Sequence, residues 1–587
     1  MAALWATASY WILCLFLGIF LFLGVYNEEY GHVSLRKKPK YNFPDFNRIY
    51  HTRILEEQDI SLDANERIIV VGDVHGMNNS LHKLLHSLSY QPHNDILIFA
   101  GDLLAKSTPQ GSFSLLDFVT ANQYLEDASI SSNKANRTKK ERIFAVRGNH
   151  DHLVVQWRTW RDWFSKIELH NNSSDSAYKK YKHAQDAPVA NGLDFLHLLE
   201  AEWEHEKRHR ESDAEEWVEV TRKRAEGTWK EKWWERIPEP GKGKRKQEWR
   251  MFGDHYWLAK EMTAEHARYI TSLPLILHIP SMHFFVVHAG LLPYNTRLPP
   301  SDPRQPLTHL PPSKDKSIPD SNLDSDVPSD SDDESEDVQA ENVRYMRMMP
   351  TFVVIPGVGA LPVWYPDSPS TSASGEIRIE KDGRDEEILR RLQESAILHD
   401  IPQNRKWWNV LNIRTIRKSG KISRDGDRGK PWNRFWNDQM RRCKGFNLSA
   451  SSFPSSSSPS IRLQEDSSGT YPDSDSDSDS YSLRCRPSTV VYGHAASRGL
   501  DLKRWSKGLD TGCLYGRRLT SLVLSHTDPG AGSTQAGDTD ETEEDAERRK
   551  KKGWGERTKF GEDDSGIWAR IHSIRCQAPD LEQKPQA

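Results

Sequence analysis

The sequence predicts a mixed α/β (α+β) sandwich that is interrupted by long insertions and preceded by a membrane anchor. Short hydrophobic runs of strand length alternate with helical patterns, as a mixed sandwich requires. Stretches rich in Ser, Asp, Pro and Lys separate these runs, and the first apolar segment of the chain carries no charge.

The composition sets limits on the core and on the partners. Only 36% of the 587 residues are hydrophobic, so much of the chain is expected to lie outside a core. The 80 Lys and Arg residues nearly balance the 84 Asp and Glu residues, so no nucleic-acid partner is expected. The five cysteines are scattered without a CxxC pair, which predicts neither a zinc finger nor a disulfide scaffold and leaves one bridge open.

The uncharged residues 4–26 are long enough to cross a hydrocarbon core of about 30 Å as a helix. We expect a single transmembrane signal anchor, with a cleaved signal peptide as the alternative, followed by a polar stem over residues 27–65. Basic residues between Arg36 and Lys40 favour a cytosolic domain, whereas five glycosylation sequons would be usable only in a secretory lumen. The sequons lie at Asn78, Asn136, Asn171, Asn172 and Asn447. The orientation stays open.

The folded domain is expected over residues 66–525. The predicted strands are 67–71, 95–100, 142–146, 283–287, 488–492 and 519–524, and the predicted helices are 81–88 and 114–121. Insertions are expected at 155–250, 300–400 and 443–484, and residues 526–587 form a charged tail. The first insertion is expected to be helical in part and to end in a basic loop at 242–246, whereas the Ser- and Asp-rich stretches and the tail should be disordered.

Polar blocks follow five of these strands. They are Gly72-Asp73-Val-His75-Gly76, Gly101-Asp102, Gly148-Asn149-His150-Asp151, His288-Ala-Gly290 and Gly493-His494. Strand ends gather such side chains into one cleft, and the glycines allow sharp turns there. Carboxylates, imidazoles and an amide oxygen suit Zn, Mn or Fe, and one shared carboxylate can hold two ions about 3.5 to 4 Å apart. Each block alone is typical of a turn, but the ordered set indicates hydrolysis of phosphoesters or phosphoanhydrides.

The five blocks resemble those of the calcineurin-like metallophosphoesterase superfamily, in particular its phosphoprotein-phosphatase branch. The resemblance implies a four-layer α/β/β/α sandwich, two divalent ions and a metal-activated bridging hydroxide, with Zn preferred and Mn, Fe or Co as alternatives. It assigns the first metal to Asp73, His75 and Asp102, and the second to Asp102, Asn149, His288 and His494. His150 would protonate the leaving oxygen.

The second block departs from the branch pattern. Ala105 and Lys106 stand where protein phosphatases carry Asp and Arg, so the sequence leaves open what orients His150. Lys106 can still bind phosphate as a point charge. Alanine at this place resembles the bacterial diadenosine tetraphosphatases and their fungal relatives.

Further stretches look like the fungal, membrane-anchored, zinc-dependent endopolyphosphatase of the vacuole. They are IPQNRKWWNVLNIRTI, GKPWNRFW and VVYGHAASRGLDLKRWSKGLDTGCLYGRRLTSLVL. The likeness implies cleavage within inorganic polyphosphate, a vacuolar membrane location with a lumenal domain, and Arg414 as a phosphate-binding residue, with Arg147 as another. A surface salt bridge is the alternative for Arg414. Alternative functions are hydrolysis of dinucleoside polyphosphates or phosphoproteins, and an inactive membrane-tethered scaffold.

Overall fold

The structure is a computed structural model that describes part of the chain. The described residues are 49–60, 62, 66–126, 139–167, 191–207, 251–309, 352–355, 359–362, 383–446, 482–526, 555, 557–563 and 565–577. The predicted anchor at 4–26 and the basic loop at 242–246 lie outside these residues. Within the described ranges, no helix is both long and apolar enough to cross a membrane.

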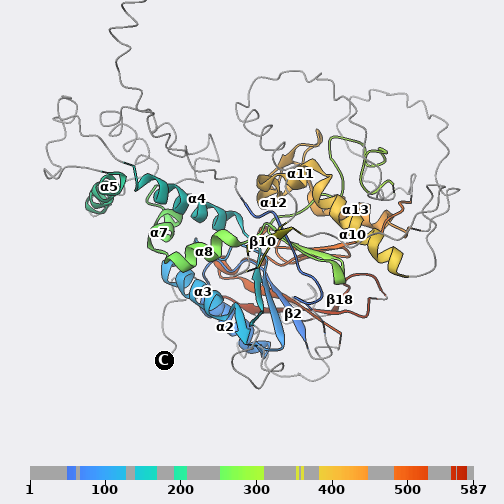
Figure 1. The fold of residues 1–587 in the computed structure, drawn as a ribbon, viewed down its shortest axis with the longest axis horizontal. Coiled ribbons are helices and arrows are strands. Elements are labelled where there is room, and N and C mark those ends of the chain that lie inside the picture. The colour runs from blue at the N-terminus through green and yellow to red at the C-terminus, as the bar shows by residue number, and fades with distance from the viewer. Residues whose placement is uncertain are drawn as a thin grey trace, which may run out of the picture.

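Two six-stranded sheets form the centre of the fold (Figure 1). The first has the order β18 (Arg557–Thr558), β19 (Trp568–Arg575), β17 (Arg518–Ser525), β2 (Arg67–Val71), β3 (Asp95–Phe99) and β6 (Ile143–Ala145). The second has the order β1 (Thr52–Ile54), β7 (Ile276–Ile279), β8 (Phe284–Val287), β14 (Thr489–Tyr492), β16 (Ser506–Gly508) and β15 (Asp501–Lys503). The prediction of a mixed α/β fold is confirmed.

The central strands explain why the hydrophobic runs are continuous. In the first sheet β2, β3 and β6 are parallel, with Ile69 opposite Leu97 and Leu97 opposite Ile143. In the second sheet β14 is parallel to β8. Parallel strands are covered on both faces, so they select Val, Ile, Leu and Phe at successive positions. All six predicted strands are present, with small differences at their ends.

Helices cover the two outer faces (Figure 1). On the first sheet they are α2 (Asn78–Ser87), α3 (Pro109–Asn122), α4 (Asn149–Phe164), α5 (Gly192–Lys207), α7 (Asp254–Glu261) and α8 (Ala264–Ser272), which share one apolar cluster with that sheet. On the second they are α10 (Gly383–His399), α11 (Pro402–Arg405), α12 (Trp407–Asn412) and α13 (Trp432–Arg442). A third cluster, which includes Ile68 and Val286, lies between the sheets. The sheets therefore pack face to face.

Short strands form the remaining sheets of the described residues. They are β4 (Tyr124–Glu126) with β5 (Lys139–Glu141), β9 (Phe352–Ile355) with β10 (Gly359–Pro362), and β11 (Thr415–Ile416) between β12 (Ile422–Ser423) and β13 (Lys430–Pro431). The three-stranded unit precedes α13 directly and carries Thr415, the neighbour of Arg414. It thus holds one candidate site residue close to the second sheet.

Several predicted domain boundaries are wrong, because segments of mostly charged sequence contain apolar residues that are buried in the core. Strand β1 in the predicted stem pairs with β7. Helix α4 runs past residue 155 and buries Trp160 completely, and α10 in the second insertion buries Ile397. In the predicted tail, β19 pairs along its whole length with β17 and buries Ile571. Each segment buries an apolar face against an element that is distant in the sequence.

The cysteine prediction is also wrong. The structure contains two disulfides, Cys443–Cys485 and Cys513–Cys576, which join residues 42 and 63 positions apart. The first follows α13, and the second joins the end of β19 to the loop before β17. Pairings over such separations depend on the fold and cannot be read from cysteine spacing.

Candidate metal centre

Strand ends deliver the candidate ligands to one pocket. Asp73 and His75 follow β2, Asp102 follows β3, and Asn149 follows β6. On the second sheet, His288 follows β8 and His494 follows β14. Because neighbouring parallel strands end at the same edge of a sheet, these side chains converge where the two sheets meet.

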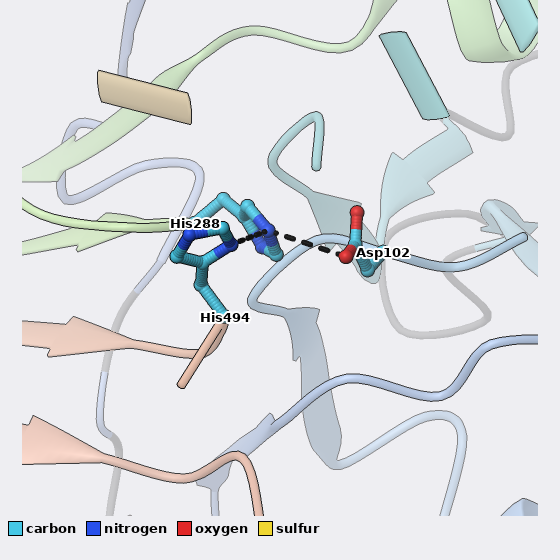
Figure 2. Close-up of side chains that lie close together, drawn as sticks. All are labelled: Asp102, His288 and His494. Carbon is cyan, nitrogen blue, oxygen red and sulfur yellow. Dashed lines mark hydrogen bonds and ion pairs between the residues drawn. The ribbon is translucent and has the colours of Figure 1, made fainter. Parts of the chain in front are cut away.

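One cluster contains Asp102, His288 and His494 (Figure 2). Asp102 Oδ2 lies 3.3 Å from His288 Nε2, and His288 Nε2 lies 3.1 Å from His494 Nδ1. Asn149 Oδ1 lies 2.9 Å from the same His288 nitrogen and 3.0 Å from His494 Nδ1. Four side chains thus direct polar atoms at one point.

A second cluster contains Asp73, His75 and Asp102. His75 Nε2 lies 3.7 Å from Asp102 Oδ2. Asp73 accepts hydrogen bonds from the backbone N–H of His494, at 3.1 and 3.0 Å to its two oxygens. Asp102 belongs to both clusters, which is the arrangement that a carboxylate bridging two ions requires.

The donor set fits a divalent cation. His288 Nδ1 lies 3.0 Å from the Ala100 carbonyl oxygen, which can only accept, so Nδ1 carries a proton and, in the neutral ring, Nε2 presents a lone pair. That lone pair faces the Asp102 carboxylate and the Asn149 amide oxygen, which also present lone pairs. A cation among these atoms would turn the repulsion into coordination, and a second contact that fixes the tautomer is typical of metal-ligating histidines.

The charges of the two carboxylates agree with this interpretation. Burial, and then the neighbouring carboxylate of Asp510, raise the pKa of Asp73 well above its ordinary value. Burial also acts to raise the pKa of Asp102, but His288 and His150 hold it well below its ordinary value. Two buried carboxylates side by side are costly unless positive charge compensates them, and bound cations would supply that charge.

The backbone around the pocket is strained. His75, Asp102, Lys106 and His494 have φ values of 49°, 47°, 67° and 66°. Residues other than glycine seldom adopt this conformation, and such strain concentrates at functional sites. At Gly493 an added Cβ would lie 1.9 Å from Asp73 Oδ1. Glycine is therefore required before His494, because the backbone there passes too close to the candidate metal ligand Asp73 for a side chain to fit.

Two of the three predicted phosphate-binding residues line the pocket. Lys106 and Arg414 do so together with the metal-ligand candidates. Arg414 Nε lies 3.1 Å from His494 Nε2, and Arg414 Nη2 donates to the His494 carbonyl at 3.0 Å. Arg147 is only 1% exposed, is not among the pocket residues, and donates from Nη2 to the Thr271 carbonyl. This placement argues against a phosphate-binding role, since the Arg147 guanidinium joins the end of β6 to the end of α8.

His150 also lines the pocket, and its surroundings are not apparent from the sequence. Its backbone N–H donates to Asp102 Oδ1 at 2.9 Å, and its Nδ1 lies 2.8 Å from His255 Nε2. His255 belongs to the first turn of α7, where the neighbouring Asp254 accepts a hydrogen bond from the backbone N–H of Lys106. No predicted strand precedes these two residues, so the strand-end signal that located the other blocks is missing here.

The loop before β17 contributes a second group that sequence reasoning missed. Asp510, Gly512, Leu514 and Tyr515 line the pocket, and Asp510 is 6% exposed. The sequence signal for this loop was the stretch GLDTGCLYG, which is part of the resemblance to a fungal polyphosphatase. It named no role for Asp510, whose place beside Asp73 is set by the packing of β17 against β2.

Comparisons with known proteins agree with the geometry. Residues 66–259 match the family described as Calcineurin-like phosphoesterase. This part of the chain is therefore similar to a calcineurin-like phosphoesterase domain, a family of metal-dependent hydrolases of phosphate compounds. No curated protein matches the chain.

Three solved structures are similar to parts of the chain. One is a candidate diadenosine tetraphosphatase, with 16% identity, a TM-score of 0.31, and coverage of 81% of this chain and 94% of that one. Another is a Saccharomyces cerevisiae serine/threonine phosphatase with similarity to human PP5, with 15% identity, a TM-score of 0.18 and coverages of 44% and 47%. The third is a metallophosphoesterase from Sphaerobacter thermophilus, with 16% identity, a TM-score of 0.17 and coverages of 40% and 54%. At these TM-scores none of them bears on the substrate.

Proposed function

We propose that this protein is a two-metal phosphohydrolase that cleaves phosphoanhydride bonds, with inorganic polyphosphate as its substrate. The observation that carries the proposal is the pair of ligand clusters that share Asp102. Asp73 and His75 complete the first cluster, and Asn149, His288 and His494 complete the second. Two bound ions, Zn or alternatively Mn, Fe or Co, would activate a bridging water and bind the oxygens of the phosphoryl group.

Residues of this chain have distinct roles in the proposed reaction. Lys106 and Arg414 lie on the same pocket as the ligand clusters and would bind the phosphate oxygens next to the scissile bond. His150 would give a proton to the leaving oxygen as the phosphorus–oxygen bond breaks. Polyphosphate suits this pocket because each phosphate unit that enters carries negative charge, which the side chains of Lys106 and Arg414 can bind.

A dinucleoside polyphosphate is the second candidate substrate, and one observation favours it. Tyr515 lines the pocket and is 62% exposed, and the Arg517 guanidinium lies 5.6 Å from its ring centroid. Exposed aromatic rings with neighbouring arginines are typical platforms for nucleobases. A phosphoprotein substrate is less well supported, because Ala105 and Lys106 replace the Asp and Arg of the protein phosphatases.

A substrate panel tests these assignments. The full-length protein with zinc or manganese is incubated with long polyphosphate, diadenosine tetraphosphate and a phosphopeptide. Endopolyphosphatase activity shortens long chains to intermediate lengths on a gel. Release of single phosphates alone contradicts internal cleavage, and exclusive turnover of the dinucleotide favours the second candidate. A folded protein that binds no metal and hydrolyses none of the three compounds would be the inactive scaffold.

The compartment is also a proposal. We assign the domain to the lumen, with the vacuolar membrane as the site of the anchor, because two disulfides are typical of an oxidising compartment. The sequon at Asn78 gives little support, since this residue begins α2 and its Oδ1 is buried. Protease protection in isolated vesicles tests the topology. Digestion of the domain in sealed vesicles that expose their cytosolic face contradicts it.

A further inference from the structure

The structure offers a replacement for the polar group that Ala105 lacks. His150 requires a fixed ring orientation if one nitrogen is to reach a leaving oxygen. The alanine side chain cannot form a hydrogen bond, and the backbone N–H of Ala105 donates to Ser112 Oγ instead. The side chain beside the His150 ring is that of His255, which is 105 positions away in the sequence.

The contact between the two histidines is close and directional. His150 Nδ1 and His255 Nε2 are 2.8 Å apart, and the rings meet edge to edge and nearly in one plane, with their centroids 5.1 Å apart and their planes at 17°. His75 meets the His150 ring edge to face, with the centroids 5.4 Å apart. His150 Nε2 makes no hydrogen bond to any part of the chain that the structure describes, and the ring lines the pocket. The contact with His255 therefore leaves Nε2 available to the substrate.

Helix α7 holds His255 in place. The next residue, Tyr256, is fully buried and donates its hydroxyl to Glu200 at 2.6 Å. Glu200 also accepts hydrogen bonds from Lys260 of α7 at 2.7 Å and from Arg161 of α4 at 2.7 Å. These buried contacts join α4, α5 and α7, so the position of His255 is set by the core.

We infer that His255 is the positioning residue for His150, accepting the hydrogen bond from His150 Nδ1–H so that His150 Nε2–H points at the leaving oxygen. The inference rests on the proposed phosphohydrolase function. In the step, a water oxygen bonds to phosphorus, and the bond from phosphorus to the leaving oxygen breaks with its electron pair on that oxygen. The oxygen takes the proton from Nε2 of the His150 ring, which starts the step with a proton on each nitrogen, and the N–H electron pair stays on the ring. His150 then remains as the Nδ1–H tautomer, still bonded to His255.

The electrostatics of His255 support its role as an acceptor. Burial, and then Lys106, lower the pKa of His255 to about 4. The ring is therefore neutral at pH 7 and can offer a lone pair at Nε2. Asp254, the residue before it, fixes the turn that carries Lys106 through the backbone hydrogen bond described above. The first turn of α7 thus serves both the predicted general acid and the predicted phosphate-binding lysine.

Two substitutions separate the hydrogen bond from the ring contact. His255→Phe keeps an aromatic ring at this position and removes the acceptor, whereas His255→Gln keeps an acceptor near the place of Nε2. The matched control is His266→Phe in α8, since His266 is 6% exposed, bonds to Asp117 at 2.8 Å and stacks on Phe113 at 14°. His266 does not line the metal pocket.

The assay compares a phosphoanhydride with p-nitrophenyl phosphate, whose activated leaving group needs little protonation. His255→Phe should lower kcat on the phosphoanhydride by about 10-fold to 100-fold with KM little changed, and have a much smaller effect on p-nitrophenyl phosphate. His255→Gln should restore most of the kcat, and His266→Phe should match the wild type. Thermal unfolding of each full-length variant checks that the fold is retained.

Two results overturn the inference. One is a His255→Phe variant with wild-type kcat on the phosphoanhydride, and the other is an equal loss on both substrates, which indicates a structural role. An inactive but folded wild-type protein is a different outcome: it refutes the proposed function, and this inference with it.

Discussion

Replacement of Asp102 by Asn is the sharpest test of the metal centre. Its Oδ2 lies 3.3 Å from His288 Nε2 and 3.7 Å from His75 Nε2, and among the described residues it is the carboxylate common to both clusters. The substitution removes a negative ligand from both ions at once. Loss of a contact that merely supports a ligand already costs about 10-fold to 100-fold in metal affinity. For a bridging ligand we expect at least about 100-fold, or about 2.7 kcal/mol, for each ion.

The measurement is metal content by mass spectrometry after gel filtration in metal-free buffer. The wild-type protein should retain about two ions per chain, Asp73→Asn about one, and Asp102→Asn close to none, because Asp73 belongs to one cluster only. The matched control is Asp95→Asn at the other end of β3, where a carboxylate with 1% exposure pairs with Arg67 at 2.6 Å. Asp102→Asn protein that still carries two ions would refute the bridged centre.

Three further predictions concern phosphate binding and stability. Arg414→Lys should raise KM by about 10-fold because a bidentate donor is lost, whereas Arg147→Lys should lower the melting temperature and leave KM unchanged; the reverse pattern contradicts the assignment. Burial acts to raise the pKa of Glu394, but hydrogen bonds from two histidines lower it from 4.5 to about 2. Glu394→Gln should therefore lower the free energy of unfolding by about 3 kcal/mol at pH 7. This stability is present above pH 4.5 and is lost as the pH falls through about 2, so the gap in melting temperature should close over that range, and a constant gap contradicts the reasoning. Cys513→Ser should lower the melting temperature and the activity together. The disulfide to Cys576 closes a loop over 63 positions, and in the chain-entropy model this bond contributes about 4 kcal/mol to the free energy of unfolding. Cys443→Ser, which breaks the other disulfide, serves as the control, and equal activity in both variants argues against a role of the Cys513–Cys576 bond at the pocket.

The sequence predicted the centre of the domain well because its signals are local. A buried parallel strand is a continuous apolar run, and the polar block after each run must lie at the end of the sheet. The runs before Asp73, Asp102 and His494 therefore predicted β2, β3 and β14 and the convergence of their following blocks. Lys106 and Arg414 reach the same pocket, although the role of each as a phosphate-binding residue remains a prediction.

The sequence by itself thus determined the mixed α/β core and which strand ends carry the candidate metal ligands. Only the tertiary structure decided that His255 lies against His150, that Arg147 turns away from the pocket, that β19 completes the first sheet, and which cysteines pair. These features join residues about 40 to 125 positions apart, or depend on where one guanidinium points. A hydrophobic period reports only which face of its own segment is buried, whereas a contact between distant segments is fixed when helices and sheets pack together.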